Sequence, residues 1–326
     1  MSTRHVAAAI QPVDRCWVCD HDQFDPFLQC AFEHTQFAAR DPELAAYTGA
    51  RLWLRRCRRC GFGQPEAVPA LTHYFDRMYD QHWSDEWIES EFVSRSKDLI
   101  FRGILADLRR RVPAAERRLL DVGAHVGKFL HQAAQDGWRV EGIELNPRTA
   151  AYAARRTGAV IHQVNLDAFL MTGGQVDAVT LIDVLEHIPE PVRMLRKIRQ
   201  LLKPGGWVGV KVPCAPSQLR KERVRAALRS GYQIAIGTNL VHVNHFDPGS
   251  LVRALEAAGF EKATVRTAAP ELSMVVGSRL RVALDDLVRM TIFLCGRWMP
   301  GAVHWPVALN LQAYGRARRG DVARAP

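Results

Sequence analysis

The stretch from Leu119 to Leu130 constrains the fold of this chain more than any other. It reads Leu-Leu-Asp-Val-Gly-Ala-His-Val-Gly-Lys-Phe-Leu, an apolar run followed by a turn with two glycines and by residues that suit a helix. Glycines at such a turn let the backbone approach a ligand, and the first N–H groups of the new helix are unpaired and can face an anionic group. The stretch therefore predicts a strand, a ligand-binding turn and a helix, with a purely structural unit of the same shape as the alternative.

A carboxylate at the end of the next apolar run strengthens the ligand-binding interpretation. Glu144 lies at the end of the run from 139 to 145, about 20 residues after the glycine turn, where nucleotide-binding sheets place a carboxylate on the ribose. Apolar runs and helical patterns then alternate, and the run from 176 to 182 is apolar on both faces, as in a parallel sheet covered by helices. We expect further strands at 160–164, 176–182, 207–212, 260–267 and 307–314.

Charge and length add weaker constraints. The chain has 326 residues and a formal net charge of +10, from 44 Lys and Arg against 34 Asp and Glu. Its arginines are spread along the chain, which favours an anionic partner only mildly over solvated charged faces. The first ten residues contain Arg4 and His5 instead of a sustained apolar run, and no later stretch is long and uncharged enough to span a bilayer. The sequence therefore predicts a cytoplasmic protein, whose cysteines would be reduced.

Four cysteines form two Cys-x-x-Cys pairs near the amino terminus. Cys16 and Cys19 make one pair, and Cys57 and Cys60 make the other. Each pair presents two thiolates to one tetrahedral ion, so together they predict a closed four-sulfur Zn²⁺ site with a structural role. Thiol–disulfide chemistry is the alternative, and two such pairs fit it poorly. The remaining cysteines have no partner at a useful spacing and are expected to be small buried side chains: Cys30, Cys214 and Cys295.

Arginines crowd the second cysteine pair. Cations with an aromatic side chain among them suit a nucleic-acid-binding ribbon. The run is short, however, and arginine commonly solvates the surface of a small metal-binding module, so RNA contact is the less favoured interpretation. The residues concerned are Arg51, Trp53, Arg55, Arg56, Arg58 and Arg59.

The rest of the chain can be divided by its patterns. Residues 1–70 are expected to form the zinc-binding module, 71–115 a linker with a helical cap, 116–317 the main domain and 318–326 a flexible tail. The linker is rich in aromatic residues from Thr72 to Trp83, and a single helical pattern then continues until Pro113. The apolar positions of that pattern are Phe92, Leu99, Ile104, Leu105 and Leu108.

Two insertions are expected in the main domain. Residues 213–246 contain an arginine-rich run, and we expect a lid over the acceptor whose charge suits a phosphate or carboxylate, unless the run is a solvated helix face. Residues 271–300 predict an amphipathic helix with a leucine stripe. The stripe is expected to pack onto the sheet because the polar face is not strongly basic, and contact with a membrane surface is the alternative. The stripe consists of Leu280, Leu284, Leu287 and Leu294, with Trp298, Met299 and Trp305 nearby.

Four motifs stand in the order and at the separations of a known family. They are the stretch 120–127, Glu144, Asp183-Val-Leu-Glu-His-Ile-Pro-Glu-Pro and Leu202-Lys-Pro-Gly-Gly. Together they resemble the class I S-adenosylmethionine-dependent methyltransferases, over roughly residues 85–317. With the cysteine module, the chain resembles bacterial zinc-ribbon methyltransferases found with natural-product, sugar or polysaccharide genes. The resemblance implies an α/β fold with a Rossmann-like seven-stranded sheet, mostly parallel with the last strand antiparallel, beside a small amino-terminal zinc-ribbon module.

The resemblance also implies S-adenosyl-L-methionine as cofactor. The positions that would bind it are Asp121, Gly123 and Gly127 for the methionine end, Glu144 for the ribose hydroxyls, Asn165 and Leu166 beside the adenine, and also Asp183. The chain departs from the family at His125, where a middle glycine is common, and at Asn165, where aspartate is frequent. Asn can still accept a hydrogen bond, so these changes weaken the site without removing it.

The implied reaction asks little covalent chemistry of the protein, because the sulfonium methyl is already activated and the acceptor attacks it in line. A base is needed when the acceptor is a hydroxyl or a protonated amine, and histidine suits neutral pH. His187 follows the fourth strand, while His242 and His245 precede a later helix. We expect His245 or His187 to act as the base, each with a structural role as the alternative, and Asp183 and Glu186 are weaker candidates.

The sequence therefore predicts a methyltransferase for a small-molecule, sugar, polysaccharide or natural-product acceptor. An RNA methyltransferase whose ribbon holds the phosphate backbone is one alternative, and an inactive binding or scaffold protein is another. Enzymes that methylate base amines usually carry an Asp/Asn-Pro-Pro-aromatic motif after the fourth strand. This chain reads Asp183-Val-Leu-Glu186 there, which argues against that chemistry.

Overall fold

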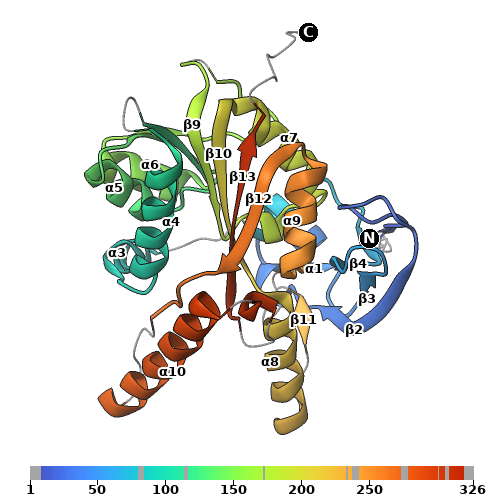
Figure 1. Cartoon of the computed structure of the whole chain (residues 1–326). Helices are drawn as coiled ribbons and strands as arrows, with labels where there is room; N and C mark the ends of the chain where they lie inside the picture. Colours follow the sequence, from blue (N-terminus) through green and yellow to red (C-terminus); the bar gives the residue numbers. More distant parts are fainter. Residues whose placement is uncertain are drawn as a thin grey trace.

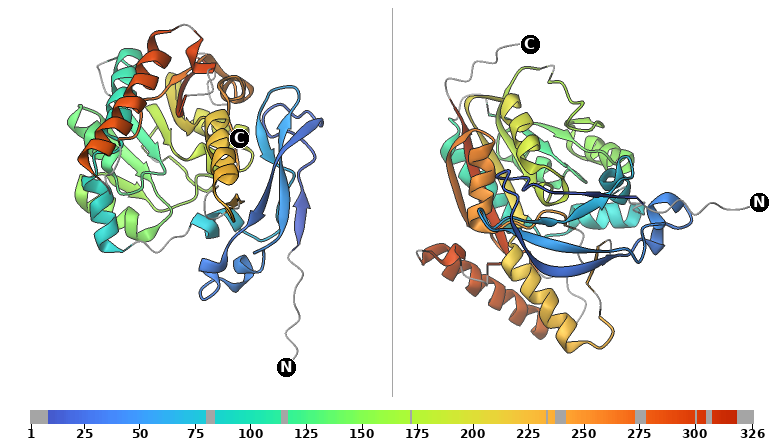
Figure 2. Two further views of the ribbon diagram at one scale, coloured as in Figure 1. Left: turned by 90° about the horizontal axis from the view of Figure 1, so that it is seen from below. Right: turned by 90° about the vertical axis from the view of Figure 1, so that its right-hand side faces the viewer.

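The computed structural model describes residues 9–79, 84–113, 117–171, 173–232, 234–236, 242–272, 278–299, 301–304 and 308–318. These residues form a seven-stranded sheet, a four-stranded sheet and a two-stranded ribbon (Figure 1). The large sheet is the centre of the main domain. The two smaller sheets come mainly from the amino-terminal residues and lie to one side of it (Figure 2).

The large sheet has the strand order β12-β13-β10-β9-β6-β7-β8. Its strands are β6 (Arg118–Val122), β7 (Arg139–Ile143), β8 (Val160–His162), β9 (Val176–Ile182), β10 (Leu202–Pro213), β12 (Phe260–Thr267) and β13 (Asn310–Ala317). The pairs from β8 to β10 are parallel, whereas β13 runs antiparallel between β10 and β12. The predicted seven-stranded fold is confirmed. The strand order reverses beside β6, so the carboxyl ends of β6 and β9 border the crevice in which such sheets bind ligands.

Helices cover both faces of this sheet. The helices α4 (Asp98–Arg111) and α5 (Lys128–Gln135) pack on one face, and α7 (Pro191–Leu201) and α9 (Pro248–Ala257) pack on the other (Figure 1). Apolar residues recur every three or four positions, and burying each contributes roughly 1.5–3 kcal/mol. The innermost side chains are Ile100, Ile104, Leu108 and Leu130 on the first face and Leu195, Ile198, Leu251 and Leu255 on the second. A further helix, α6 (Pro147–Thr157), begins behind Asn146, whose side chain accepts the N–H of Arg148 at 3.0 Å.

The amino-terminal residues form a sheet of their own. The strands β2 (Phe24–Phe32), β3 (Arg51–Cys57) and β4 (Gly63–Pro65) are antiparallel, and β1 (Ile10–Pro12) pairs with β5 (Ala67–Pro69). The short helices α1 (Pro42–Ala45) and α2 (Tyr74–Tyr79) complete this part. On β3 the residues alternate, since Leu52 and Leu54 are buried while Arg51 and Trp53 are exposed, as expected for a sheet with one covered face.

The main domain contributes backbone to this small sheet. The strand β11 (Ala235–Ile236), from the insertion after β10, pairs in parallel with the end of β2. Gly63 and His245 exchange two backbone hydrogen bonds of 3.0 and 2.9 Å. The cores are also continuous, because Phe62 packs against Phe246 with ring centroids 5.0 Å apart. The module and the insertion are thus built as one unit.

The segment before β6 differs from its prediction. The expected single helix is two helices, α3 (Asp85–Val93) and α4, because the backbone of Ser94 is extended. The Ser94 hydroxyl donates to Ser96 Oγ at 3.0 Å and accepts its N–H at 3.3 Å, so local bonds replace helical ones. The break places Lys97 at the start of α4. Other strand boundaries also shift: β8 ends at His162, β10 spans Leu202–Pro213 and β13 spans Asn310–Ala317.

Both insertions leave the carboxyl edge of the parallel strands. The first contains α8 (Ala215–Leu228) and the second α10 (Arg279–Trp298), and the two helices extend from the same end of the molecule (Figures 1 and 2). The expectation that the leucine stripe of α10 packs onto the sheet is wrong, since its four leucines are 45–72% exposed. Among the residues that the structure describes, every helix is too short or too polar to cross a bilayer. Residues 80–83, Val241, Trp305 and the tail from 319 lie outside the described residues.

Candidate active site

The turn after β6 has the geometry that its glycines predict. Gly123 and Gly127 have φ values of +77° and +79°, in the left-handed region. A Cβ on Gly123 would lie 2.4 Å from a methyl carbon of Val184, and one on Gly127 would lie 2.8 Å from the Cβ of Ala153. Any other residue at either position would push the turn away from β9 or α6. The turn is therefore held open to a ligand by close packing behind it.

Asp121 lies at the end of β6, below the turn. Its carboxylate is buried and accepts a hydrogen bond of 2.6 Å from the hydroxyl of Thr180 on β9. Burial raises the pKa of Asp121 to about 7, because the charged form loses its hydration. A cationic group bound at the turn would favour the charged form.

Glu144 lies beside the same turn, at the end of β7. Its Oε2 accepts the N–H of His125 at 2.7 Å and its Oε1 accepts the N–H of Asn146 at 2.9 Å. Burial raises the pKa of Glu144, although these two N–H groups act in the opposite direction. The carboxylate thus links the turns after β6 and β7. Its place beside the glycine turn is the one that a ribose ligand requires, and its role there stays a prediction.

The predicted adenine-side residues follow β8. Leu166 is buried, whereas Asn165 is exposed and its amide nitrogen lies 3.5 Å from a carboxylate oxygen of Asp76 on α2. The two residues follow β8, which lies two strands from β6 and Asp121, and their place beside the adenine stays a prediction. The side chain of Asn165 can still accept a hydrogen bond, as we expected from the sequence.

A partly buried network of charges surrounds Asp183, after β9. Lys97 Nζ donates to Asp183 Oδ2 at 2.9 Å, and Lys211 Nζ donates to Asp183 Oδ1 and to Glu271 Oε1, the latter at 3.1 Å. Burial by itself raises the pKa of Asp183, but the ammonium groups of Lys211 and Lys97 outweigh it and hold the pKa well below its usual range. Asp183 is therefore a fixed negative charge at the crevice.

Sequence reasoning missed Lys97 and Lys211. Lys211 was visible as a cation in an otherwise apolar strand, and such a residue is buried only when it is paired. Lys97 gave no comparable signal, because its position depends on the break between α3 and α4.

Three further side chains meet beside this network. Glu186, His187 and His242 each offer a possible ligand atom, and these atoms all lie within 4.8 Å of one another. The rings of His187 and His242 have centroids 4.9 Å apart, and His242 Nδ1 lies 2.8 Å from the amide nitrogen of Gln218. Burial, with the charge of Asp183, raises the pKa of Glu186 to about 8, while burial lowers the pKa of His242 well below its usual value. Such a cluster can take a proton from a reacting group, and its donor set also suits a divalent cation.

His245 lies differently from His187. Its ring is buried and meets the ring of Phe27 on β2 edge-on, with centroids 6.2 Å apart. Burial lowers the pKa of His245 to about 4. The ring faces the amino-terminal sheet, where its backbone also pairs with Gly63. This placement favours His187 over His245 as the residue that meets an acceptor. It also adds His242 to the candidate site, a residue for which the sequence predicted no role.

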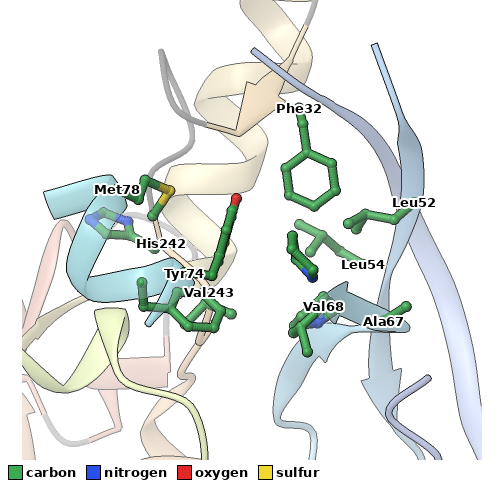
Figure 3. A pocket seen from close by; sticks show the side chains of 12 residues that line it. Phe32, Leu52, Leu54, Ala67, Val68, Tyr74, Met78, His242 and Val243 are labelled. Carbon is green, nitrogen blue, oxygen red and sulfur yellow. The ribbon is translucent and has the colours of Figure 1, made fainter. Parts of the chain in front are cut away.

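An apolar pocket lies between the amino-terminal sheet and His242 (Figure 3). Figure 3 shows Phe32, Leu52 and Leu54 on one side and Tyr74, Met78 and His242 on the other. The hydroxyl of Tyr74 is engaged with His34 Nε2 at 2.8 Å. The pocket therefore offers a hydrocarbon lining with an imidazole at its edge.

The four predicted metal ligands come together. The sulfur atoms of Cys16 and Cys60 are 3.5 Å apart, as are those of Cys19 and Cys57, and all four lie within 4.8 Å of one another. A tetrahedral zinc ion with Zn–S bonds of about 2.3 Å requires sulfur separations of roughly 3.8 Å, so the group fits the ion. Cys30 and Cys214 are buried as expected, but the expectation for Cys295 is wrong because α10 leaves it exposed.

Most of the arginines beside the cysteines have partners within the protein. Arg55 lies over the ring of Phe24 at 4.5 Å and donates to the carbonyl oxygen of Val13, while Arg58 pairs with Asp25 at 2.7 Å. Arg51, Arg56, Arg58 and Arg59 are exposed. Exposed cations therefore remain beside the cysteines, and RNA contact stays the less favoured prediction.

Comparison with known proteins agrees with the motifs and the sheet. A family model described as a methyltransferase domain matches residues 97–265, just over half of the chain. A ubiquinone biosynthesis O-methyltransferase from Albidiferax ferrireducens is 32% identical over 149 residues, which cover 44% of this chain and 57% of the relative. One from Pseudomonas aeruginosa is 33% identical over 104 residues, covering 30% of this chain and 45% of the relative. The chain thus spans about half the length of these curated relatives.

Among solved structures, the plantazolicin methyltransferase BpumL has a TM-score of 0.50 at 14% identity, covering 77% of this chain and 95% of that one. This likeness concerns the fold alone. The family match, the sheet order and the motif positions lead to one conclusion: the chain belongs to the class I S-adenosylmethionine-dependent methyltransferases.

Proposed function

We propose that the protein transfers the methyl group of S-adenosylmethionine to a small-molecule acceptor. The observation that carries the proposal is the arrangement at the carboxyl edge of the sheet. There the glycine turn lies close to Val184, next to Asp183, and bonds to Glu144, while Glu186, His187 and His242 meet near Asp183. A cofactor held by the turn would present its methyl group toward the histidines.

The chain's own residues then have distinct roles. Glu144 accepts hydrogen bonds from the ribose hydroxyls, and the turn from 121 to 127 holds the methionine end. The acceptor oxygen or nitrogen attacks the methyl carbon in line, the carbon–sulfur bond breaks, and its electron pair returns to sulfur to give S-adenosylhomocysteine. The proton of the acceptor passes to His187, with His242 and Glu186 beside it. His245 remains the alternative base.

The acceptor is proposed to carry an apolar portion. The pocket beside His242 is lined by hydrocarbon and aromatic side chains, and its free space of about 20 Å³ would take only a small apolar group. The curated relatives are named for ubiquinone biosynthesis, which is also small-molecule chemistry. The arginine-rich run of α8 gives less support to an anionic or glycan acceptor, because Arg225 pairs with Glu222 and Arg223 donates to Phe27.

Zinc is proposed to hold the amino-terminal module together. Its four sulfur ligands would leave no position for substrate, so the ion would supply stability and take no part in methyl transfer. The two Cys-x-x-Cys pairs lie against the main core through Cys16, Val18 and Cys57. Loss of the ion would therefore disturb the packing of this module against the core that contains α7 and α9.

Calorimetric titration with S-adenosylhomocysteine, followed by transfer of a labelled methyl group to a panel of phenols, amines and sugars, tests the proposal. We expect binding by the wild type, at least about tenfold weaker binding by Glu144→Gln, and no change in the matched variant Glu190→Gln, whose side chain is exposed. A wild-type protein that binds neither S-adenosylmethionine nor its product contradicts the proposed activity. Transfer to sugars alone contradicts the apolar acceptor.

A further inference from the structure

The helix α10 presents an apolar face that is separate from the methyl-transfer site. Its inner face contacts the sheet, because Phe293 packs into the core and a Cβ on Gly296 would lie 2.9 Å from Thr267. The opposite face carries large apolar side chains between 45% and 78% exposed. They are Leu280, Leu284, Leu287, Val288, Leu294 and Trp298. Together they present several hundred Å², more than scattered surface residues account for and approaching the roughly 800 Å² that each partner gives to a stable interface.

The spacing of this face is that of a helix that pairs with another helix. The exposed positions follow one another by four, three, four, three and four residues, which is the a/d repeat of a coiled coil sustained over the whole helix. A helix that lies on a lipid surface needs no such repeat and carries basic residues along its polar side. Here the described charges are mixed, and Asp285 and Arg289 pair with each other at 2.7 Å. The repeat consists of Leu280, Leu284, Leu287, Thr291, Leu294 and Trp298.

We propose that α10 is the interface of a symmetric dimer, in which it packs antiparallel against α10 of a second copy of this chain. The repeat is symmetric about residue 289. An antiparallel pair centred there sets Leu280 against Trp298, Leu284 against Leu294 and Leu287 against Thr291 of the other copy. Each apolar residue on one helix thus meets a residue of the repeat on the other, which is the self-complementarity that a two-fold interface requires.

The charges beside the repeat also fit this arrangement. In antiparallel coiled coils the e positions of the two helices face each other, and so do the g positions. In this register Arg281 lies next to Cys295 of the second copy, and Arg297 lies next to Ala283 of the second copy. No pair of like charges is opposed in this register. The carboxyl-terminal end of α10 lies against β12 while the helix extends away from the sheet (Figure 1), so an antiparallel pair also keeps the two main domains at opposite ends.

Sedimentation velocity over a range of protein concentrations tests the dimer. We expect the wild type to dimerise, and the double variant Leu284→Glu, Leu287→Glu to raise the dissociation constant by at least about a hundredfold. Leu228→Glu is the matched control, because Leu228 is 80% exposed on the other protruding helix and should not change association. Folding of each variant is checked by circular dichroism. A wild type that stays monomeric at every concentration overturns the proposal, as does binding to anionic phospholipid vesicles by a protein that does not self-associate.

A cross-linking experiment tests the direction of packing. Arg281→Cys introduces a thiol that should lie beside the native Cys295 of the second copy, so mild oxidation is expected to give a covalent dimer on a non-reducing gel. The same substitution combined with Cys295→Ser should not give it. In the antiparallel pair the two native Cys295 residues are about 20 Å apart, from the rise of 1.5 Å per residue. Efficient Cys295–Cys295 cross-linking of the wild type indicates a parallel pair and refutes this arrangement.

Discussion

The buried carboxylate of Asp121 makes the stability of the cofactor-free protein depend on pH in a direction that can be measured. Burial raises the pKa of Asp121 from 3.8 to about 7. Between these values the folded protein holds a proton that the unfolded chain has released, so stability falls as pH rises through this window. Replacing Asp121 with Asn removes that cost. At 1.36 kcal/mol per pKa unit, the variant is expected to gain about 4 kcal/mol over the wild type near pH 8, but only about 2 kcal/mol near pH 5.5.

Urea unfolding of both proteins at the two pH values, without cofactor, measures this difference. Asn can still accept the hydrogen bond from Thr180, so the change removes the charge and keeps the contact. Asp167→Asn is the matched control, because Asp167 is exposed and forms only a surface pair with Arg193. A stability difference for Asp121→Asn that is the same at both pH values, or a variant that is less stable than the wild type near pH 8, refutes the electrostatic account of this site.

Three further predictions concern the acceptor side and the metal. His187→Ala is expected to lower kcat about 10²–10⁴-fold for a hydroxyl acceptor while leaving the affinity for S-adenosylhomocysteine unchanged, and an equal loss in both would point to a structural role. Because the pKa of Glu186 is raised to about 8, kcat/KM of the wild type should change near that pH, and the same profile in Glu186→Gln would contradict this assignment. Cys57→Ser should remove the metal, seen by elemental analysis, and lower the melting temperature, whereas Cys295→Ser should do neither.

Much of the fold was predictable because it depends on local patterns. The glycine turn after β6, the doubly apolar run of β9 and the cap before α6 each specify backbone geometry with a few residues, and parallel strands joined by helices leave few topologies. The pair of Cys-x-x-Cys motifs likewise predicted a four-sulfur cluster, whose geometry follows from the ligand type.

The parts that sequence reasoning missed depend on contacts between distant segments. The break after α3 was hidden because Ser94 is acceptable within a helix, and only its local hydrogen bonds end the helix there. The meeting of His242 with His187 depends on how the insertion folds back over the sheet, which no periodicity encodes. The outward face of α10 was misjudged for a related reason: an amphipathic pattern identifies an apolar face but does not say what that face packs against.

The pairing of β11 with β2 makes the amino-terminal module inseparable from the insertion that reaches it. A protein truncated before residue 71 would leave β11 without its neighbour and would uncover the surface of Phe246 against which Phe62 packs. Unpaired strand edges and bared apolar surface promote aggregation. Recombination that exchanges modules between relatives must therefore carry residues 213–246 together with the first 70, so the two segments should be inherited as a linked pair.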